Sequence, residues 1–265
     1  MDSPLTRKKG IDAAALKLAA LITMLVNHTC IVYFKYVNGQ PEWLESLHWY
    51  LTRGSFVIFM FLLSEGMIHT KNRGRYMLRL AITAVASEVI YDLCFERTPV
   101  YWKNQNVVFT LLAAAFAVYL WDKLEKVPLL RLPMVAAICA VVYFCKFDYD
   151  IIGIITILAF YVFRKNKTKC LVAGATAFVF STFLHYAVSL ADRGWFAERY
   201  FEVGIQHFFR YSTEEICGLV AFLPLAFYNG EKGKSGRIKY GFYLAYPAHL
   251  LVLYVLTSIA ISLKA

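Results

Sequence analysis

One histidine lies inside the first long apolar stretch of the chain. Residues 16–30 read LKLAALITMLVNHTC, which places His28 among side chains that a bilayer favours. On a helix, Lys17, Met24 and His28 share one stripe, with Lys17 roughly 16 Å from His28. Because an imidazole without a partner is costly in hydrocarbon, we expect His28 to face a cavity that holds water or a ligand. Histidine titrates near neutral pH, which suits a general base.

Such a base needs a partner that orients its ring. Asn27 is adjacent in sequence but points about 100° away on a helix, so Glu88, Asp92 or Asp150 from another helix is the better candidate. Glu88 and Asp92 share a helix face at i, i+4, where two carboxylates repel unless a cation such as Arg53 lies between them. Two interpretations stay open for this group: a role in the chemistry, or a structural ion-pair network.

A second group of polar residues is basic and lies toward the opposite membrane face. Lys17, Arg75 and Arg79 could hold phosphates through charge-assisted hydrogen bonds. The same cluster also suits a plain topology signal, because Lys and Arg gather in cytoplasmic loops of membrane proteins.

Three further positions complete the candidate site. Asn106 opens an apolar helix as its N-cap. Tyr246 and His249 flank Pro247 at i, i+3, which predicts a kinked helix and a cavity wall, although a membrane proline is often just a bend. No role is expected for His48, His69 and His207, which fall in or near loops, or for His185 beyond the membrane interface.

The composition indicates a membrane protein. The chain has 265 residues, of which 59% are hydrophobic and 17% charged, and this is typical of a polytopic helical membrane protein. The net charge of +10 comes from short basic clusters between apolar runs, so it indicates membrane topology rather than nucleic-acid binding. The six cysteines are scattered without metal-ligand spacing, so no metal is predicted. We expect a single unit over residues 1–265.

Apolar runs predict an all-α bundle of about nine transmembrane helices. One set of alternate loops carries roughly twice as many Lys and Arg as the other, which predicts a cytoplasmic N-terminus and an outer C-terminus. The first run follows Arg7–Lys9 without a cleavage site and is expected to stay as an anchor. Residues 191–212 are rich in aromatic and basic side chains and favour an amphipathic segment at the outer interface over a substrate lid. The predicted runs are 11–34, 47–69, 75–95, 106–121, 131–145, 150–163, 169–190, 213–229 and 240–262.

Six ordered segments resemble the TraX family, the membrane acetyltransferases of conjugative pilin maturation. That family is similar in turn to membrane acyltransferases of the acyltransferase-3 type, which use acetyl-CoA. The segments are Met24–His28, Phe59–Gly66 leading to Tyr76–Leu80, Ser87–Glu88, Asn106–Thr110, Tyr149–Gly153 and Tyr246–Leu250.

The resemblance implies that His28 is the catalytic base, that Arg79 belongs to the acyl-donor site, and that the acceptor is an amino group at the outer surface. Asn27 departs from the pattern, because an acidic residue is expected there in relatives. The chain is then an acetyl-CoA-dependent acyltransferase of the bacterial plasma membrane, with a peptide or protein as acceptor.

Three other functions use the same residues. The acceptor could be a hydroxyl of a cell-envelope glycan. A proton-coupled transporter or channel would also bury His, Arg and carboxylates, although the chain shows no internal repeat. A scaffold protein would use the polar groups only to join helices. Binding and transfer of acetyl-CoA would separate the enzymes from the other two.

Overall fold

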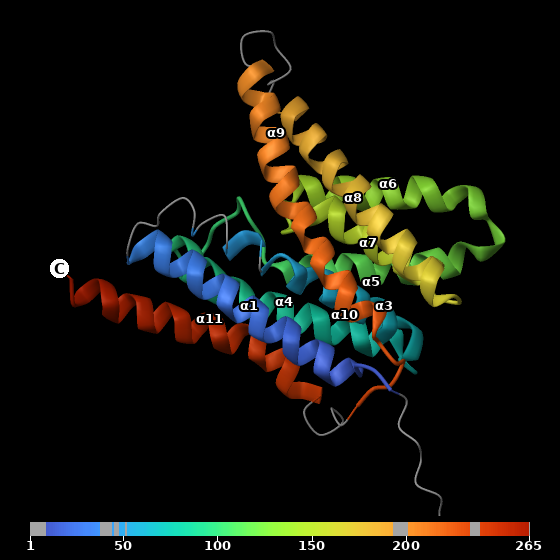
Figure 1. Ribbon diagram of the computed structural model, residues 1–265, viewed down its shortest axis with the longest axis horizontal. Helices are drawn as coiled ribbons and strands as arrows, with labels where there is room; N and C mark the ends of the chain where they lie inside the picture. Colours follow the sequence, from blue (N-terminus) through green and yellow to red (C-terminus); the bar gives the residue numbers. More distant parts are fainter. Residues whose placement is uncertain are drawn as a thin grey trace, which may run out of the picture.

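The structure is a computed structural model that describes residues 9–37, 44, 48–50, 52–192, 201–233 and 239–264. These residues form helices without any strand (Figure 1). The helices are α1 (Ala13–Tyr36), α3 (Gly54–His69), α4 (Arg73–Glu96), α5 (Val107–Lys123), α6 (Arg131–Phe144), α7 (Asp150–Val162), α8 (Lys167–Asp192), α9 (Phe201–Ile216), α10 (Phe222–Ala226) and α11 (Lys239–Ser262).

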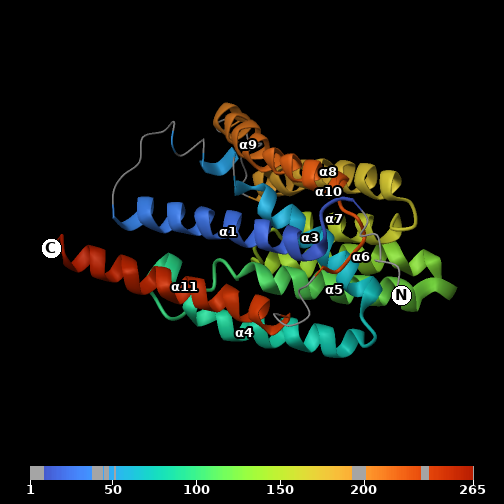
Figure 2. The ribbon, with the colours of Figure 1, turned by 60° about the horizontal axis from the view of Figure 1, so that its bottom comes forward.

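Successive long helices along the chain alternate in direction, so their ends gather at two opposite ends of the bundle (Figure 2). At the first end, where α1 begins, the backbone of Ile11 pairs with the chain after α10, and Arg73 donates to Asp122 at 2.6 Å. At the second end, where α1 finishes, Tyr36 donates to the carbonyl of Phe95 at 2.5 Å. Figure 2 shows the start of α1 and the finish of α11 at these opposite ends. This alternation agrees with the predicted topology, and the side that faces the cytoplasm stays a prediction.

Five helices in the described part of the chain are long and apolar enough to cross a bilayer, by length and composition. The helix α4 is as long as α1 but carries several charged residues, and α6 and α7, at 14 and 13 residues, are too short to span roughly 30 Å of hydrocarbon in a straight line. A multi-pass membrane protein is therefore supported, while the predicted number of nine spans is not confirmed. The five spans are Ala13–Tyr36, His48–His69, Val107–Lys126, Lys167–Asp192 and Tyr243–Ser262.

The predicted run 213–229 is where the fold departs most from the expectation. The helix α9 ends at Ile216, a 3₁₀ turn follows over Cys217–Ala221, and α10 occupies only five residues. Pro224 lacks the backbone N–H that a continuous helix requires, which accounts for a break one turn earlier. A single helix over 213–229 was therefore wrong.

The predicted interfacial segment at 191–212 lies partly outside the described residues, which resume at 201. From there the chain forms α9, which packs along α8, and the two project together from the rest of the bundle (Figure 1). The rings of Phe183 and Phe208 stack between them at 5.7 Å. The membrane position of this segment stays a prediction.

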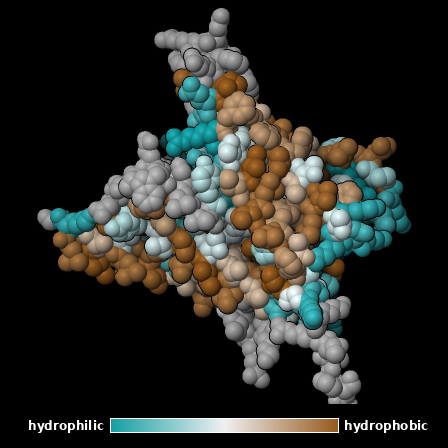
Figure 3. All heavy atoms as spheres, in the orientation of Figure 1, coloured by the Kyte–Doolittle hydropathy of each residue, from teal (hydrophilic) through white to brown (hydrophobic). Residues whose placement is uncertain are grey.

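The outer surface carries large apolar side chains at helical spacing. Leu78, Ile82, Val85 and Val89 line one exposed stripe of α4, and Figure 3 shows similar apolar surface across the flanks of the bundle. A soluble protein rarely exposes so much apolar area, so this surface suits contact with lipid.

The short helix α7 lies inside the bundle, against α3, α5 and α8. Gly153 permits its contact with α5, because a Cβ there would stand 2.5 Å from a methyl of Thr110. A Cβ at Gly174 of α8 would stand only 2.2 Å from the ring of Phe160, so α7 and α8 also pack through a glycine.

Candidate functional site: a pocket that ends beside a histidine pair

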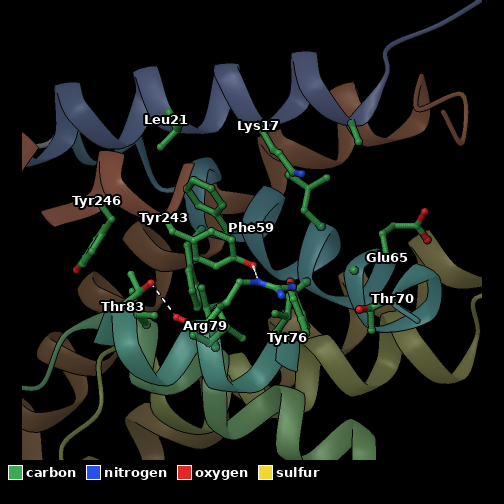
Figure 4. Close-up of a pocket in the computed structure, with 18 of the residues that line it drawn as sticks. Lys17, Leu21, Phe59, Glu65, Thr70, Tyr76, Arg79, Thr83, Tyr243 and Tyr246 are labelled. Atoms are coloured by element: carbon green, nitrogen blue, oxygen red, sulfur yellow. Dashed lines mark hydrogen bonds between the residues drawn. The ribbon is translucent and has the colours of Figure 1, made fainter. Parts of the chain in front are cut away.

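A pocket of about 520 Å³ opens between α1, α3, α4, α5 and α11. This volume is in the range that holds a small molecule or part of a cofactor. Figure 4 shows Lys17 on α1 and Arg79 on α4 reaching into the same hollow from opposite sides. Glu65 and Thr70 lie toward one end of it and Tyr246 toward the other.

The basic side of the pocket is built around Arg79. Its guanidinium lies over the rings of Tyr76 and Tyr243, at 5.6 and 5.8 Å from their centroids, and its Nε is 3.5 Å from the Tyr243 hydroxyl. Two aromatic faces therefore hold the cation in place without neutralising it. Lys17 and Lys232 also line the pocket, so its basic side can accept an anion.

The other end of the pocket is apolar and stops at Met24 and Tyr246. His28 lies one helical turn beyond Met24, and its ring meets that of Tyr246 at a centroid distance of 6.4 Å. The ring of Phe95 packs against the same imidazole nearly at a right angle, with the two centroids 5.2 Å apart. The His28 ring therefore points into the interface of α1, α4 and α11 and not toward lipid.

His28 has a second histidine as its partner. Its Nδ1 lies 2.7 Å from Nε2 of His249, and the two rings meet edge to edge, with centroids 5.0 Å apart and planes 17° apart. The other nitrogen of His249, Nδ1, lies 2.9 Å from the carbonyl oxygen of Ala245 on the same helix. The predicted cavity wall on α11 is thus in direct contact with the predicted base.

Asn27 points away from this pair, as its position on the helix predicted. Its Oδ1 accepts hydrogen bonds from Thr52 at 2.8 Å and from Nε2 of His48 at 3.2 Å. His48, for which no role was expected, is only 6% exposed and takes part in this contact. The pair Asn27 and His48 joins α1 to the chain just before α3.

The carboxylates proposed to orient His28 have other partners. Glu88 accepts from the backbone N–H and the side-chain amide of Asn106, at 3.1 and 2.5 Å. Asp92 accepts from the backbone N–H of Tyr101 at 2.7 Å, and Asp150 pairs with His185 at 2.9 Å. The prediction that Glu88, Asp92 or Asp150 orients His28 was therefore wrong.

Arg53 likewise does not lie between Glu88 and Asp92. It pairs with Glu215 of α9 at 3.2 Å and donates to the Tyr149 hydroxyl at 3.0 Å, while its guanidinium lies over the ring of Trp49. A separate buried cluster thus joins α3 to α7 and α9. Helix periodicity placed Glu88 beside Asp92 correctly but gave no sign of which helix supplies the cation.

Two other predictions have contrasting outcomes. Asn106 is fully buried and caps α5 by accepting from the N–H of Val108 at 3.0 Å, which confirms the predicted N-cap. Arg75 is exposed and does not belong to the pocket lining, so of the predicted donor-site cations only Lys17 and Arg79 are brought together.

Sequence reasoning missed several residues of the site. Tyr76 lies three residues before Arg79, and Tyr243 lies three before Tyr246, so helical spacing alone could have grouped them. Lys232 carried no signal beyond its charge. Outside the pocket, Asp148 lies between α6 and α7 beside the cluster of Arg53 and Glu215, and burial raises its pKa to about 7.

Metal ligands do not gather in the described residues: no group of three or more His, Cys, Asp or Glu side chains is placed to hold an ion.

The fold and the site define a helical membrane protein with an internal pocket that leads toward a partly buried histidine pair. Residues 12–257 match the TraX protein family, and the chain belongs to that family. It is also similar to a probable fimbrial assembly protein FimC, serogroup H1, of Dichelobacter nodosus, at 25% identity over 257 residues, which cover 94% of this chain and 97% of that protein. No solved structure matches. Similarity to the acyltransferase-3 type stays a prediction.

Proposed function

We propose that this protein is an integral-membrane acetyltransferase that moves an acetyl group from cytoplasmic acetyl-CoA to an amino group at the outer side of the membrane. The observation that carries the proposal is the course of the pocket, from the cations Lys17 and Arg79 to Tyr246, whose ring packs on His28. The family supports it through the resemblance of the sequence to pilin-modifying membrane acetyltransferases.

The residues of the pocket fit acetyl-CoA as a substrate. Its phosphates are anionic and suit the side of the pocket that Lys17, Arg79 and Lys232 line. Its pantetheine arm is long and weakly polar, which suits the walls that α1, α3 and α5 provide. About 16 Å of helix separates Lys17 from His28, so the donor can enter at one end and react near the other.

In the proposed reaction, His28 takes a proton from the acceptor ammonium and frees the nitrogen lone pair. The amine nitrogen attacks the thioester carbonyl, the carbon–sulfur bond breaks, and CoA leaves as the thiolate. As the tetrahedral adduct collapses, its nitrogen gives up a second proton to the leaving thiolate. The products are the amide and the CoA thiol, and His28 releases the first proton to water. The acetyl carbonyl has to pass the Tyr246 ring to reach this base, so a movement of that ring is part of the proposal. Holding the reactants in line supplies much of the rate.

A protein acceptor is favoured over a glycan by one observation. The relative from Dichelobacter nodosus is named as a probable fimbrial assembly protein, and fimbriae are protein fibres. Transfer to a glycan hydroxyl would use the same base and donor, so the chemical stability of the product separates the two. Hydroxylamine removes acetyl groups from esters and leaves amides intact.

The test uses purified protein in lipid nanodiscs with radiolabelled acetyl-CoA and membranes of a strain that lacks the protein. We expect label to enter a hydroxylamine-resistant product. His28→Ala should lower transfer by about 10²- to 10⁴-fold, the usual contribution of a general base, and leave CoA binding unchanged. The matched control is His207→Ala, on α9 outside the pocket, with wild-type rates expected. Full activity of His28→Ala would remove His28 from the role. Absence of both CoA binding and transfer in the wild type would instead favour a transporter or a scaffold.

A further inference from the structure

We infer that His249 is a positioning residue that fixes the tautomer of His28, so that the His28 ring carries its proton on Nδ1 and presents Nε2 as the free basic nitrogen. The inference deepens the proposed function and rests on it for the catalytic consequence. The tautomer itself follows from two hydrogen bonds and is testable without any activity.

The first bond determines the protonation of His249. Its Nδ1 lies 2.9 Å from the carbonyl oxygen of Ala245, one turn earlier on α11. A carbonyl oxygen only accepts hydrogen bonds, so Nδ1 of His249 has to carry the hydrogen. A neutral imidazole has a single N–H, and Nε2 of His249 is therefore left as an acceptor.

The second bond transfers this assignment to His28. Its Nδ1 lies 2.7 Å from Nε2 of His249, a distance at which one of the two nitrogens has to donate. Because Nε2 of His249 is the acceptor, Nδ1 of His28 is the donor. The lone pair on Nε2 of His28 is then available to accept a proton.

The surroundings favour the neutral pair. The two rings pack against Phe95 and Tyr246, and a protonated His249 would place a cation among aromatic side chains within the bundle. Charge in such a place is costly unless an anion compensates it. The hydrogen-bond partners of the two rings are each other and the carbonyl oxygen of Ala245, and none of these is an anion.

His249 takes the place that a carboxylate has in the catalytic triads of soluble enzymes. Those carboxylates fix the tautomer of the base and stabilise the imidazolium that forms. Here a neutral ring, itself anchored to its own helix, fixes the tautomer without a second buried charge. When His28 gains a proton on Nε2, its Nδ1–H bond to His249 becomes charge-assisted and stronger.

Two variants of His249 separate positioning from packing. His249→Gln places an amide oxygen where Nε2 stands and keeps an acceptor for His28, whereas His249→Leu fills the space without one. With protein labelled with ¹⁵N-histidine in lipid bilayers, and the His28 signals assigned from their loss in His28→Ala, ring nitrogen shifts report the tautomer directly. We expect the Nδ1–H form in the wild type and in His249→Gln, and its loss in His249→Leu.

Kinetics provide the second readout. His249→Leu should lower kcat by about 10- to 100-fold, as loss of an orienting partner typically does, with little change in KM for acetyl-CoA, and His249→Gln should recover most of the rate. An Nε2–H form of His28 in the wild type would overturn the inference, as would an unchanged tautomer in His249→Leu. If His249→Leu fails to fold, the His28 tautomer in the wild type and in His249→Gln still tests the inference. An Nδ1–H tautomer without any acetyl transfer would uphold the assignment and refute the proposed function.

Discussion

Two buried polar groups lie toward the second end of the bundle, and they differ in charge. His28 and His249 form a neutral pair between α1 and α11, beside the pocket. Arg53 and Glu215 form an ion pair between α3 and α9 that Tyr149 extends to α7. A neutral pair can gain and lose a proton without breaking, whereas removing either charge from a buried ion pair leaves the other uncompensated. The first group therefore suits chemistry and the second suits holding helices together.

The largest effect is expected from removal of the cation in the second group. Arg53→Met leaves the Glu215 carboxylate buried at 3% exposure, and breaking such a pair destabilises a fold by about 3–5 kcal/mol. The measurement is the free energy of unfolding of the variant and of the wild type in bilayers, obtained by trapping the unfolded form.

The control for this prediction is the double variant Arg53→Met with Glu215→Leu, which removes both charges and should recover most of the stability, together with transfer activity. A folded Arg53→Met protein that binds CoA but transfers no acetyl group would contradict the comparison. Arg53 would then take part in the chemistry, which is the alternative that the sequence left open for it.

A smaller loss is expected where α7 and α8 meet through a glycine. Gly174→Ala forces a methyl against the buried ring of Phe160, and overpacking of this kind costs about 1–3 kcal/mol. Gly74→Ala, in the first turn of α4, is the matched control, since its methyl would meet only Asn72 at 3.4 Å and alanine favours a helix. The difference in thermal stability between the two variants is the measurement. Equal stability would show that the contact between α7 and α8 at Gly174 is not tightly packed.

The pocket predicts an effect on binding and none on folding. Arg79→Gln should weaken acetyl-CoA binding by about 10- to 100-fold, the equivalent of one charge-assisted interaction. Arg75→Gln removes the same charge four residues earlier, on the exposed face of α4, and should change the affinity little. Equilibrium binding in nanodiscs distinguishes the two. Equal losses would mean that the basic cluster acts only through its overall charge.

Much of the fold follows from the sequence because apolar runs and loop charges are local signals. The predicted run 131–145 is the helix 131–144, and 150–163 is 150–162. The prediction of one helix over 213–229 was wrong because a broken helix and a continuous helix would be equally apolar there. Similarly, the turn before α7 has positive φ at Lys146 and Tyr149 without a glycine, and bonds from Gln105, forty residues earlier, hold it.

The sequence predicted which residues lie near the site better than it predicted which of them contact each other. Tyr246 was predicted on a cavity wall and lines the pocket. His28 and His249 lie just beyond the lining, where they contact each other and Tyr246. The partner of His28 was wrong, because which helix lies opposite is set by packing of the whole bundle. A carboxylate was expected on chemical grounds, and the membrane interior supplies a neutral ring instead.

The smallest effect concerns Asp148, whose half-buried carboxylate faces Arg53, Glu215 and Asp150. Burial raises its pKa from 3.8 to about 7, and Arg53 opposes the shift. The folded state therefore binds more protons than the unfolded state between these values, so this residue costs stability as the pH rises from about 4 to 7, and the cost is constant above 7. Asp148→Asn should equal the wild type near pH 4 and exceed it at pH 8 by about 1 kcal/mol, since partial exposure screens the charge.

Stability of both proteins measured from pH 4 to 8 tests the sign for Asp148. Glu125→Gln, at an exposed position near the first end, controls for the change in net charge. If Asp148→Asn gained nothing at high pH, the carboxylate would have to be stabilised as the anion, with Arg53 shared between it and Glu215. The ion pair between α3 and α9 would then be a three-membered cluster, and the loss of stability in the Arg53→Met variant would grow as the pH rises from about 4.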